Sequence, residues 1–272
     1  MGSTTNVHGL SRGIPEPVAR DVRQRCGFGC VICGCGIIQY HHFDPPFGEA
    51  HRHDSHGITL LCGRCHDKVT RGLIGANSVR QADAAPFCRQ AGVTRDMLFL
   101  GARATTVRLG CALFSAEAII QVDDTILFGF SKPQVDSPLL LNANLPRENG
   151  GTLLRIVNNE WQVGVDNFDV YTKGPRLVVQ EKEGELALEL RYPGDGLLEL
   201  SRLTMRIRGA RVECRPDAFE VTNRNGGRVC LRPQAGATSS NVVGDIGLHF
   251  TANVCLIAAS KTGGGAAVCL AL

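Results

Sequence analysis

The chain has 272 residues, with 29 Lys and Arg against 26 Asp and Glu, so a net charge of +3 excludes a strongly basic protein that coats nucleic acid. Apolar residues make up 43% and charged residues 20%, which is typical of a folded globular chain and excludes a disordered one. Without a long apolar run or the apolar segment of a secretory signal, the sequence predicts a cytoplasmic protein with no membrane partner.

The N-terminal part of the chain predicts a small module of short elements. Residues 1–13 are interpreted as a flexible leader. A helix is expected over 18–25. Pro15 and Pro17 open this stretch, since Pro is tolerated in a first helical turn, and Gly27 and Gly29 end it. Two short apolar strands are expected at 37–43 and 58–61, and a second helix at 62–70. Helices and strands are thus mixed within a short stretch of chain.

The pattern of residue types changes between this module and the rest of the chain. Ser78 is expected to cap a short helix over 79–84, and Pro and Gly make 85–104 resemble a linker. Over 105–272, β-branched and apolar runs alternate with turn residues, which predicts an all-β domain, with a sandwich favoured over a solenoid. The expected fold class is α+β, with a small domain over 14–84 followed by the larger all-β domain.

Two pairs of cysteines predict a metal site in the small module. Cys30 and Cys33, like Cys62 and Cys65, are separated by two residues. Four thiolates on two tight turns form a tetrahedral set of soft ligands, which suits Zn²⁺. Cys35 could replace Cys33, although its wider spacing from Cys30 makes a poorer turn. Because a closed site of four thiolates leaves no position for a substrate, the expected role of this zinc is structural.

Histidines are concentrated in the same module. His41 and His42 end the first predicted strand, and His66 follows Cys65 at the start of a predicted helix. The zinc would tie these elements together and bring His41 near His66. Adjacent strand residues point to opposite sides, so only one of His41 and His42 can face a metal there. The other is left for acid–base chemistry, for which imidazole is suited near neutral pH.

These motifs occur in a fixed order along the chain. Paired histidines, an apolar strand that ends in LLC and a CxxCH motif follow one another in the segments IPEPVARDVRQRCGFGCVICG, YHHFDPP and GITLLCGRCHDKVTRG. The set resembles HNH endonucleases, which have the ββα-metal fold with flanking zinc knuckles. The resemblance covers about residues 14–80. It implies a zinc-stapled ββα-metal nuclease domain over 14–84.

The resemblance also implies roles for individual residues. His42 matches the general base that activates water, and His41 and His66 match the ligands of a catalytic divalent ion. The family's usual central Asn would fall near Gly57, where this sequence has none. Candidates for part of its role come from the preceding loop, namely His51, His53, Asp54 and His56. Basic residues near the site are candidates for contacts to DNA phosphates, namely Arg64, Lys68 and Arg71.

Phosphodiester hydrolysis needs an activated water and stabilisation of the charge on the phosphate and leaving oxygen. His42 would take the proton from water, and an ion on His41 and His66 would hold the phosphate. Mg²⁺, Mn²⁺, Ni²⁺ or Co²⁺ could serve, since imidazole favours the later metals. The resemblance favours double-stranded DNA as the substrate. The alternative is a zinc-stapled nucleic-acid-binding module without catalysis.

The C-terminal region carries no recognisable catalytic motif. Its apolar, β-prone tail predicts burial within the fold or in a subunit interface, so a homo-oligomer is expected. A nuclease joined to a separate β domain is similar in layout to bacterial restriction and anti-phage effectors. That analogy predicts a regulatory or oligomerisation domain, with a small-molecule or protein activator. A ligand sensor or scaffold is the alternative role of the β domain.

Overall fold

A computed structural model of the chain gives a mostly β fold with few helices. The chain divides into two compact units. Unit 1 comprises Met1–Asp96 and Val163–Thr172, and unit 2 comprises Met97–Gln162 and Lys173–Leu272. The structure describes residues 5–100, 106–122, 125–131, 139–194, 196–222, 224–231, 240–243, 246–251, 254–257 and 268–271.

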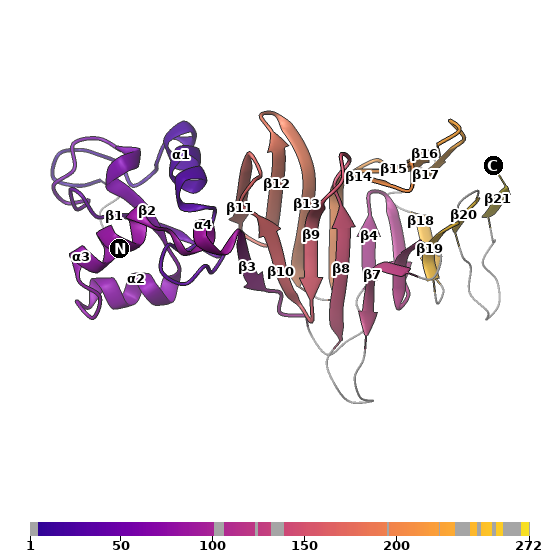
Figure 1. The fold of residues 1–272 in the computed structure, drawn as a ribbon, viewed down its shortest axis with the longest axis horizontal. Helices are drawn as coiled ribbons and strands as arrows, with labels where there is room; N and C mark the ends of the chain where they lie inside the picture. The colour runs from indigo at the N-terminus through magenta and orange to yellow at the C-terminus, as the bar shows by residue number, and fades with distance from the viewer. Residues whose placement is uncertain are drawn as a thin grey trace. The chain divides into compact units, whose positions relative to one another are not determined.

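Unit 1 is built on a short hairpin between helices (Figure 1). Helix α1 (Glu16–Cys26) ends at Gly27, which adopts the left-handed φ of 73° that favours glycine. Strands β1 (Gln39–His42) and β2 (Ile58–Leu61) pair antiparallel, with His41 opposite Thr59. Helix α2 (Gly63–Thr70) follows β2 directly. The described order strand, strand, helix therefore agrees with the elements predicted over 37–70.

The core of unit 1 is formed by α1, β2 and the turns that carry the cysteines. All four residues of β2 are buried and three of them are apolar, so the strand lacks the alternating pattern of a strand with one solvated face. The fully or almost fully buried side chains of this core include Val22, Cys26, Val31, Ile58, Leu60 and Leu61. The cysteine turns are thus packed into the core rather than attached to its surface.

Several elements differ from the sequence-based predictions. Helix α3 (Ala76–Ala84) begins after Gly75, so Ser78 lies inside the helix and is not its cap. The range predicted as a linker contains helix α4 (Phe87–Ala91) and strand β3 (Val93–Met97). Cys88 in α4 and Thr94 in β3 are both buried, so this range is part of the folded structure and not a solvated linker.

The segment predicted as a flexible leader makes specific contacts within unit 1. Nδ2 of Asn6 donates hydrogen bonds of 2.7 Å to the carbonyls of Phe47 and Ala50. Thr5 and Ser11 form an isolated antiparallel bridge, which turns the segment back on itself. The described part of the leader is therefore attached to the loop between β1 and β2.

Unit 2 contains two extended arrays of strands. In the first, neighbours follow the order β21-β20-β19-β6-β7-β8-β9-β10, antiparallel except for the parallel pair β19 and β6. The strands of this array are β6 (Ala118–Val122), β7 (Thr125–Ser131), β8 (Leu140–Pro146), β9 (Thr152–Val157), β10 (Glu160–Gly164), β19 (Ile246–Thr251), β20 (Val254–Ile257) and β21 (Val268–Ala271).

In the second array, strands β12 to β17 follow one another as antiparallel neighbours. Strand β4 runs parallel to β14 and antiparallel to β5, which in turn runs parallel to β18. The strands named here are β4 (Thr106–Leu109), β5 (Ala112–Ser115), β12 (Arg176–Lys182), β13 (Glu185–Gly194), β14 (Leu197–Ile207), β15 (Ala210–Arg215), β16 (Ala218–Thr222), β17 (Arg228–Leu231) and β18 (Ser240–Val243). Strand β11 (Asp169–Lys173) contributes most of its residues to unit 1.

The prediction of a β-rich region after the small module is confirmed, since the described residues beyond 105 form strands and no helix. Neither sheet is closed. The preference for a sandwich over a solenoid stays a prediction. Over the described residues, no helix has both the length and the apolar character needed to cross a membrane.

Candidate functional site

Four cysteine thiols from two turns meet beside β2 and α2. The potential ligand atoms of Cys30, Cys33, Cys62 and Cys65 all lie within 4.8 Å of one another. Sγ of Cys33 is 3.6 Å from Sγ of Cys62 and 3.8 Å from Sγ of Cys65. A tetrahedral zinc with bonds of about 2.3 Å places its sulfurs about 3.8 Å apart. The cluster could therefore hold a metal ion such as zinc.

Cys35, the alternative ligand considered from spacing, points to a different partner. Its Sγ donates a hydrogen bond of 2.8 Å to Oδ2 of Asp96. Cys62 is the N-cap residue of α2, and its Sγ accepts from the backbone N–H of Cys65 at 3.4 Å. The geometry thus favours Cys33 over Cys35 as the fourth member of the cluster.

The thiols of the cluster differ in acidity. Burial raises the pKa of Cys30 to about 11. Burial also acts to raise the pKa of Cys62, but hydrogen bonds from the Cys65 backbone and the neighbouring thiols outweigh it and lower that pKa. Because a metal binds thiolates, filling the cluster would release protons. Cys62, at the N-terminus of α2, therefore loses its proton more readily than Cys30.

His41 and His66 approach each other from β1 and α2. Their ring centroids lie 5.0 Å apart, with the rings at 88°. Burial, followed by the neighbouring His66, lowers the pKa of His41, so the neutral imidazole that a metal requires is favoured. Apart from the cysteine cluster, the described residues contain no group of three or more His, Cys, Asp or Glu arranged to hold a metal. An ion on these two rings would therefore need further ligands from water or a bound phosphate.

His42 packs into different surroundings from its neighbour His41. Its ring lies 5.3 Å from the ring of Phe47, and its Nε2 lies 3.1 Å from Nδ1 of His53. Burial lowers the pKa of His42 to about 4, with contributions from His53, His41 and Arg12. His42 is therefore neutral at pH 7 and has a lone pair for a proton.

The loop between β1 and β2 is closed by backbone contacts at Gly57. The carbonyl of Gly57 accepts hydrogen bonds from the amides of Phe43 at 2.9 Å and Asp44 at 3.3 Å. A Cβ atom on Gly57 would lie only 2.0 Å from the carbonyl oxygen of Asp44. No side chain fits here, which gives a physical reason for the lack of Asn at this position.

The other predicted loop residues have contacts to residues other than His42. The ring of His51 stacks on that of His8, with centroids 3.8 Å apart. Asp54 caps the short 3₁₀ helix η1 (Ser55–Gly57) by accepting the N–H of His56 at 3.0 Å. These three predicted residues line a pocket of about 470 Å³ together with Asp44, Pro45, Glu49, Arg52 and Gly57. Of the four loop candidates, His53 is the one that the structure brings to His42.

The predicted DNA-contacting residues lie on or next to α2 and are exposed. A hydrogen bond to Cys33 raises the pKa of Arg64, which lies beside the cysteine cluster. Nε of Arg71 contacts Oδ1 of Asp67 at 3.0 Å, so its charge is partly engaged. Lys68 is exposed on the same helix. The three cations are therefore accessible at the surface of unit 1.

Three residues that support the site gave no signal in the sequence. Phe47 contacts His42, the guanidinium of Arg12 lies 4.6 Å above the Phe47 ring, and Asn6 holds the carbonyl of Phe47. Arg12 and Asn6 belong to the predicted leader, where polar residues are common. Such contacts depend on how the loop closes, which neither spacing nor periodicity encodes.

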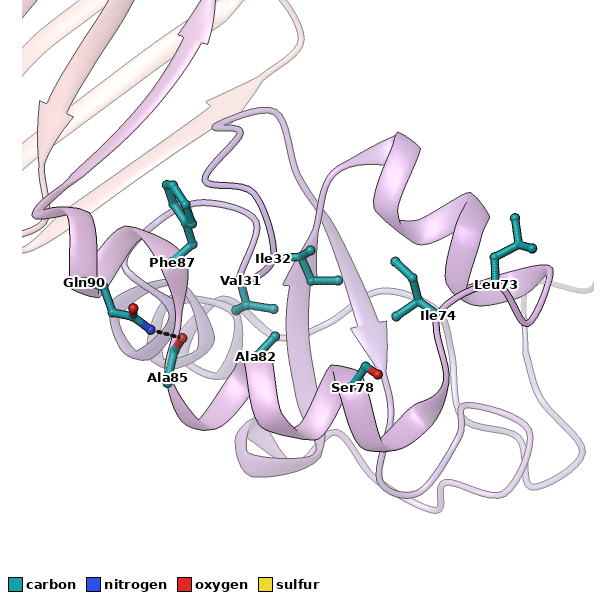
Figure 2. Close-up of a pocket in the computed structure, with 9 residues that line it drawn as sticks. All are labelled: Val31, Ile32, Leu73, Ile74, Ser78, Ala82, Ala85, Phe87 and Gln90. Carbon is teal, nitrogen blue, oxygen red and sulfur yellow. Dashed lines mark hydrogen bonds between the residues drawn. The ribbon is translucent and has the colours of Figure 1, made fainter.

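A second, mostly apolar pocket of about 410 Å³ lies in unit 1 between the first cysteine turn and helices α3 and α4 (Figure 2). Val31 and Ile32 come from the turn, and Leu73 and Ile74 from the segment before α3. Nε2 of Gln90 is engaged by the carbonyl of Ala85 at 2.7 Å. This lining offers no titratable group, so the pocket is not part of the candidate site.

The chain matches no known protein family, no curated protein sequence and no solved structure.

Proposed function

We propose that this protein is a metal-dependent HNH-type endonuclease that hydrolyses phosphodiester bonds in double-stranded DNA. The observation that carries the proposal is the distance of 5.0 Å between the ring centroids of His41 and His66, in the same unit as a cluster of four thiols. The antiparallel strands β1 and β2 followed by α2 support a ββα-metal arrangement. In this proposal the cysteine cluster holds a structural zinc ion.

His42 is the general base in this proposal. Burial keeps its imidazole neutral at pH 7, which is the state that can accept a proton from water. A pKa of about 4 makes it a weak base, and the negative charge of a nearby DNA phosphate would raise that pKa. Binding of DNA would thus strengthen the base at the moment of reaction.

The other residues of the site bind and orient the substrate. A Mg²⁺, Mn²⁺, Ni²⁺ or Co²⁺ ion held by His41 and His66 would supply positive charge for the phosphate and the leaving oxygen. Arg64, Lys68 and Arg71 would pair with neighbouring phosphates. Such contacts fix the position of the backbone and do not read the base sequence, so the proposed cleavage has little sequence preference of its own.

Cleavage of a supercoiled plasmid tests the proposal. The wild type, His42→Ala and His8→Ala would be compared with each divalent ion in turn and with EDTA. We expect metal-dependent cutting that falls by about 10²- to 10⁴-fold in His42→Ala, as for loss of a general base. His8 is exposed and lies outside the site, so His8→Ala should cut like the wild type.

The outcome is interpretable only if His42→Ala keeps its fold and its zinc, which circular dichroism and metal analysis would establish. Undiminished cutting by this variant would remove His42 from the mechanism. DNA binding without cleavage by the wild type, with every ion, would instead favour a zinc-stapled binding module.

The proposal extends to unit 2 as a domain that assembles or gates the nuclease, with bacterial anti-phage or restriction defence as its setting. A free nuclease of low sequence preference would endanger the genome of its own cell, so a gate is physically reasonable. Light scattering of the full chain tests assembly, with and without DNA. A homo-oligomer is expected, and a monomer under both conditions would contradict the assembly role.

A further inference from the structure

We propose that His53 is a positioning residue for His42: its Nδ1 accepts a hydrogen bond from Nε2–H of His42, which leaves Nδ1 of His42 as the nitrogen that faces the reaction. The inference rests on the proposed nuclease function and deepens it. It assigns a role to one residue of the loop between β1 and β2.

The geometry of the two rings supports a hydrogen bond. Nε2 of His42 and Nδ1 of His53 are 3.1 Å apart, within the range of N–H···N contacts, and the ring centroids are 5.2 Å apart. The ring of Phe47 is the other described aromatic neighbour of His42, and it offers no hydrogen-bonding atom. Within the described residues, the contact with His53 is the hydrogen bond that can fix the orientation of His42.

The contact allows two arrangements of the protons in neutral rings. If His53 donates, Nε2 of His42 is the acceptor and its Nδ1 carries the hydrogen, so no lone pair remains for water. If His42 donates from Nε2, its Nδ1 keeps a free lone pair. A base at position 42 therefore requires the second arrangement, in which the hydrogen of His53 lies on Nε2.

The surroundings of His53 point to a role other than folding. Its Nε2 is buried and has no hydrogen-bond partner among the described residues. A buried polar atom without a partner costs stability, so an apolar residue would serve packing better. The loop that carries His53 is closed at Gly57 and attached to Asn6, which holds its backbone in place. The loop thus keeps a polar ring beside His42 at a cost to the fold.

The test combines two substitutions of His53 with a matched control. His53→Phe keeps a flat ring and removes both nitrogens. His53→Asn places an amide oxygen two bonds from Cβ, where Nδ1 stands, and can accept the same hydrogen bond. His8→Phe makes the first substitution at an exposed histidine outside the site. Circular dichroism and zinc content would establish that each full-length variant is folded.

The tautomer of His42 is the direct readout, measured by long-range ¹H–¹⁵N correlation on protein labelled at histidine. Signals would be assigned with His42→Gln. We expect hydrogen on Nε2 in the wild type, His53→Asn and His8→Phe, and a mixture of tautomers in His53→Phe. Plasmid cleavage should fall by about 10- to 100-fold in His53→Phe, as for loss of a partner that orients a site histidine, and recover in His53→Asn.

Hydrogen on Nδ1 of His42 in the wild type, or a tautomer that His53→Phe leaves unchanged, would overturn the inference. The tautomer of His42 can be measured without nuclease activity, so the hydrogen bond is tested separately from the nuclease function. If the tautomers behave as expected but the wild type cuts no DNA with any ion, the hydrogen bond stands and the nuclease function fails.

Discussion

The guanidinium of Arg23 binds the carboxylate of Asp169 through two hydrogen bonds of 2.8 and 2.6 Å, although the residues are 146 positions apart. Their side chains are only 5% and 2% exposed. Burial opposes the charge of Arg23, but Asp169, Tyr40 and Glu16 outweigh it and raise its pKa above the ordinary value. Unit 1 is therefore completed by a buried ion pair with a distant segment of the chain.

Replacing Asp169 by Asn should destabilise unit 1 by up to about 3–5 kcal/mol, because the buried guanidinium of Arg23 loses its buried charged partner and keeps only the exposed carboxylate of Glu16. Urea unfolding, followed at the helical band of the circular dichroism spectrum, measures this loss. Asp67→Asn is the control, since Asp67 forms an exposed pair with Arg71 in which the side chains are 57% and 70% exposed. That change should cost about 0.5 kcal/mol or less. Equal losses from both variants would argue against a special role for the buried pair.

Purified protein should contain one zinc ion per chain, bound by the cysteine cluster. Cys33→Ser should lose the metal, because three remaining thiolates no longer close the tetrahedron. Cys35→Ser should keep it, since Sγ of Cys35 is bonded to Asp96 at 2.8 Å. Elemental analysis decides between the variants. Retention of zinc by Cys33→Ser and its loss from Cys35→Ser would instead identify Cys35 as the zinc ligand.

Gly57→Ala should be more harmful than an alanine elsewhere in the same loop. Its Cβ would lie 2.0 Å from the carbonyl oxygen of Asp44, so the loop would have to open. We expect a loss of about 1–3 kcal/mol, typical of overpacking. Gly48→Ala, where a Cβ meets nothing within 4 Å, is the matched control. Thermal unfolding of both variants makes the comparison, and equal melting temperatures would contradict the backbone closure described for Gly57.

Acid should weaken unit 2 partly through Glu220. Hydrogen bonding from Arg228 outweighs burial and lowers the pKa of Glu220 below its ordinary value of 4.5. The unfolded chain then binds the proton more readily, so this contribution to stability is present above pH 4.5 and is lost as the pH falls through the lower, folded pKa. Between pH 7 and 3, Glu220→Gln should therefore lose less unfolding free energy than the wild type.

Urea unfolding at both pH values measures the difference for Glu220. Glu117→Gln is the control, because its side chain is exposed. If Glu220→Gln shows the full acid sensitivity of the wild type, the ion pair with Arg228 contributes nothing to it.

The sequence predicted those parts of unit 1 that depend on local spacing. Two CxxC pairs require two tight turns, and their thiols meet within 4.8 Å in the structure. The order of strand, strand and helix brings His41 to His66, because β1 pairs with β2 and α2 follows β2 directly. The β-rich character after residue 105 likewise follows from composition and turn residues. Each of these features is encoded within a few residues of chain.

Contacts between distant segments could not be predicted in this way. Residues 163–172 lie in a stretch that reads as ordinary β structure, yet they belong to unit 1 through Asp169. The partnership of His42 and His53 depends on loop closure at Gly57, which is a backbone contact without a sequence period. The role of Asn6 could not be predicted either, because its partners Phe47 and Ala50 lie 41 and 44 positions away in the sequence.

The bond between Arg23 and Asp169 also has a consequence for synthesis of the chain. Arg23 leaves the ribosome 146 residues before its partner, which at 5–20 residues per second is a delay of roughly 7–30 s. During that interval unit 1 lacks the buried carboxylate of Asp169, and Arg23 keeps the exposed carboxylate of Glu16 as its acidic partner. A nascent chain that stops before residue 169 would therefore carry the histidines of the candidate site in an incomplete unit 1. The unit is completed only after much of the β region has been made.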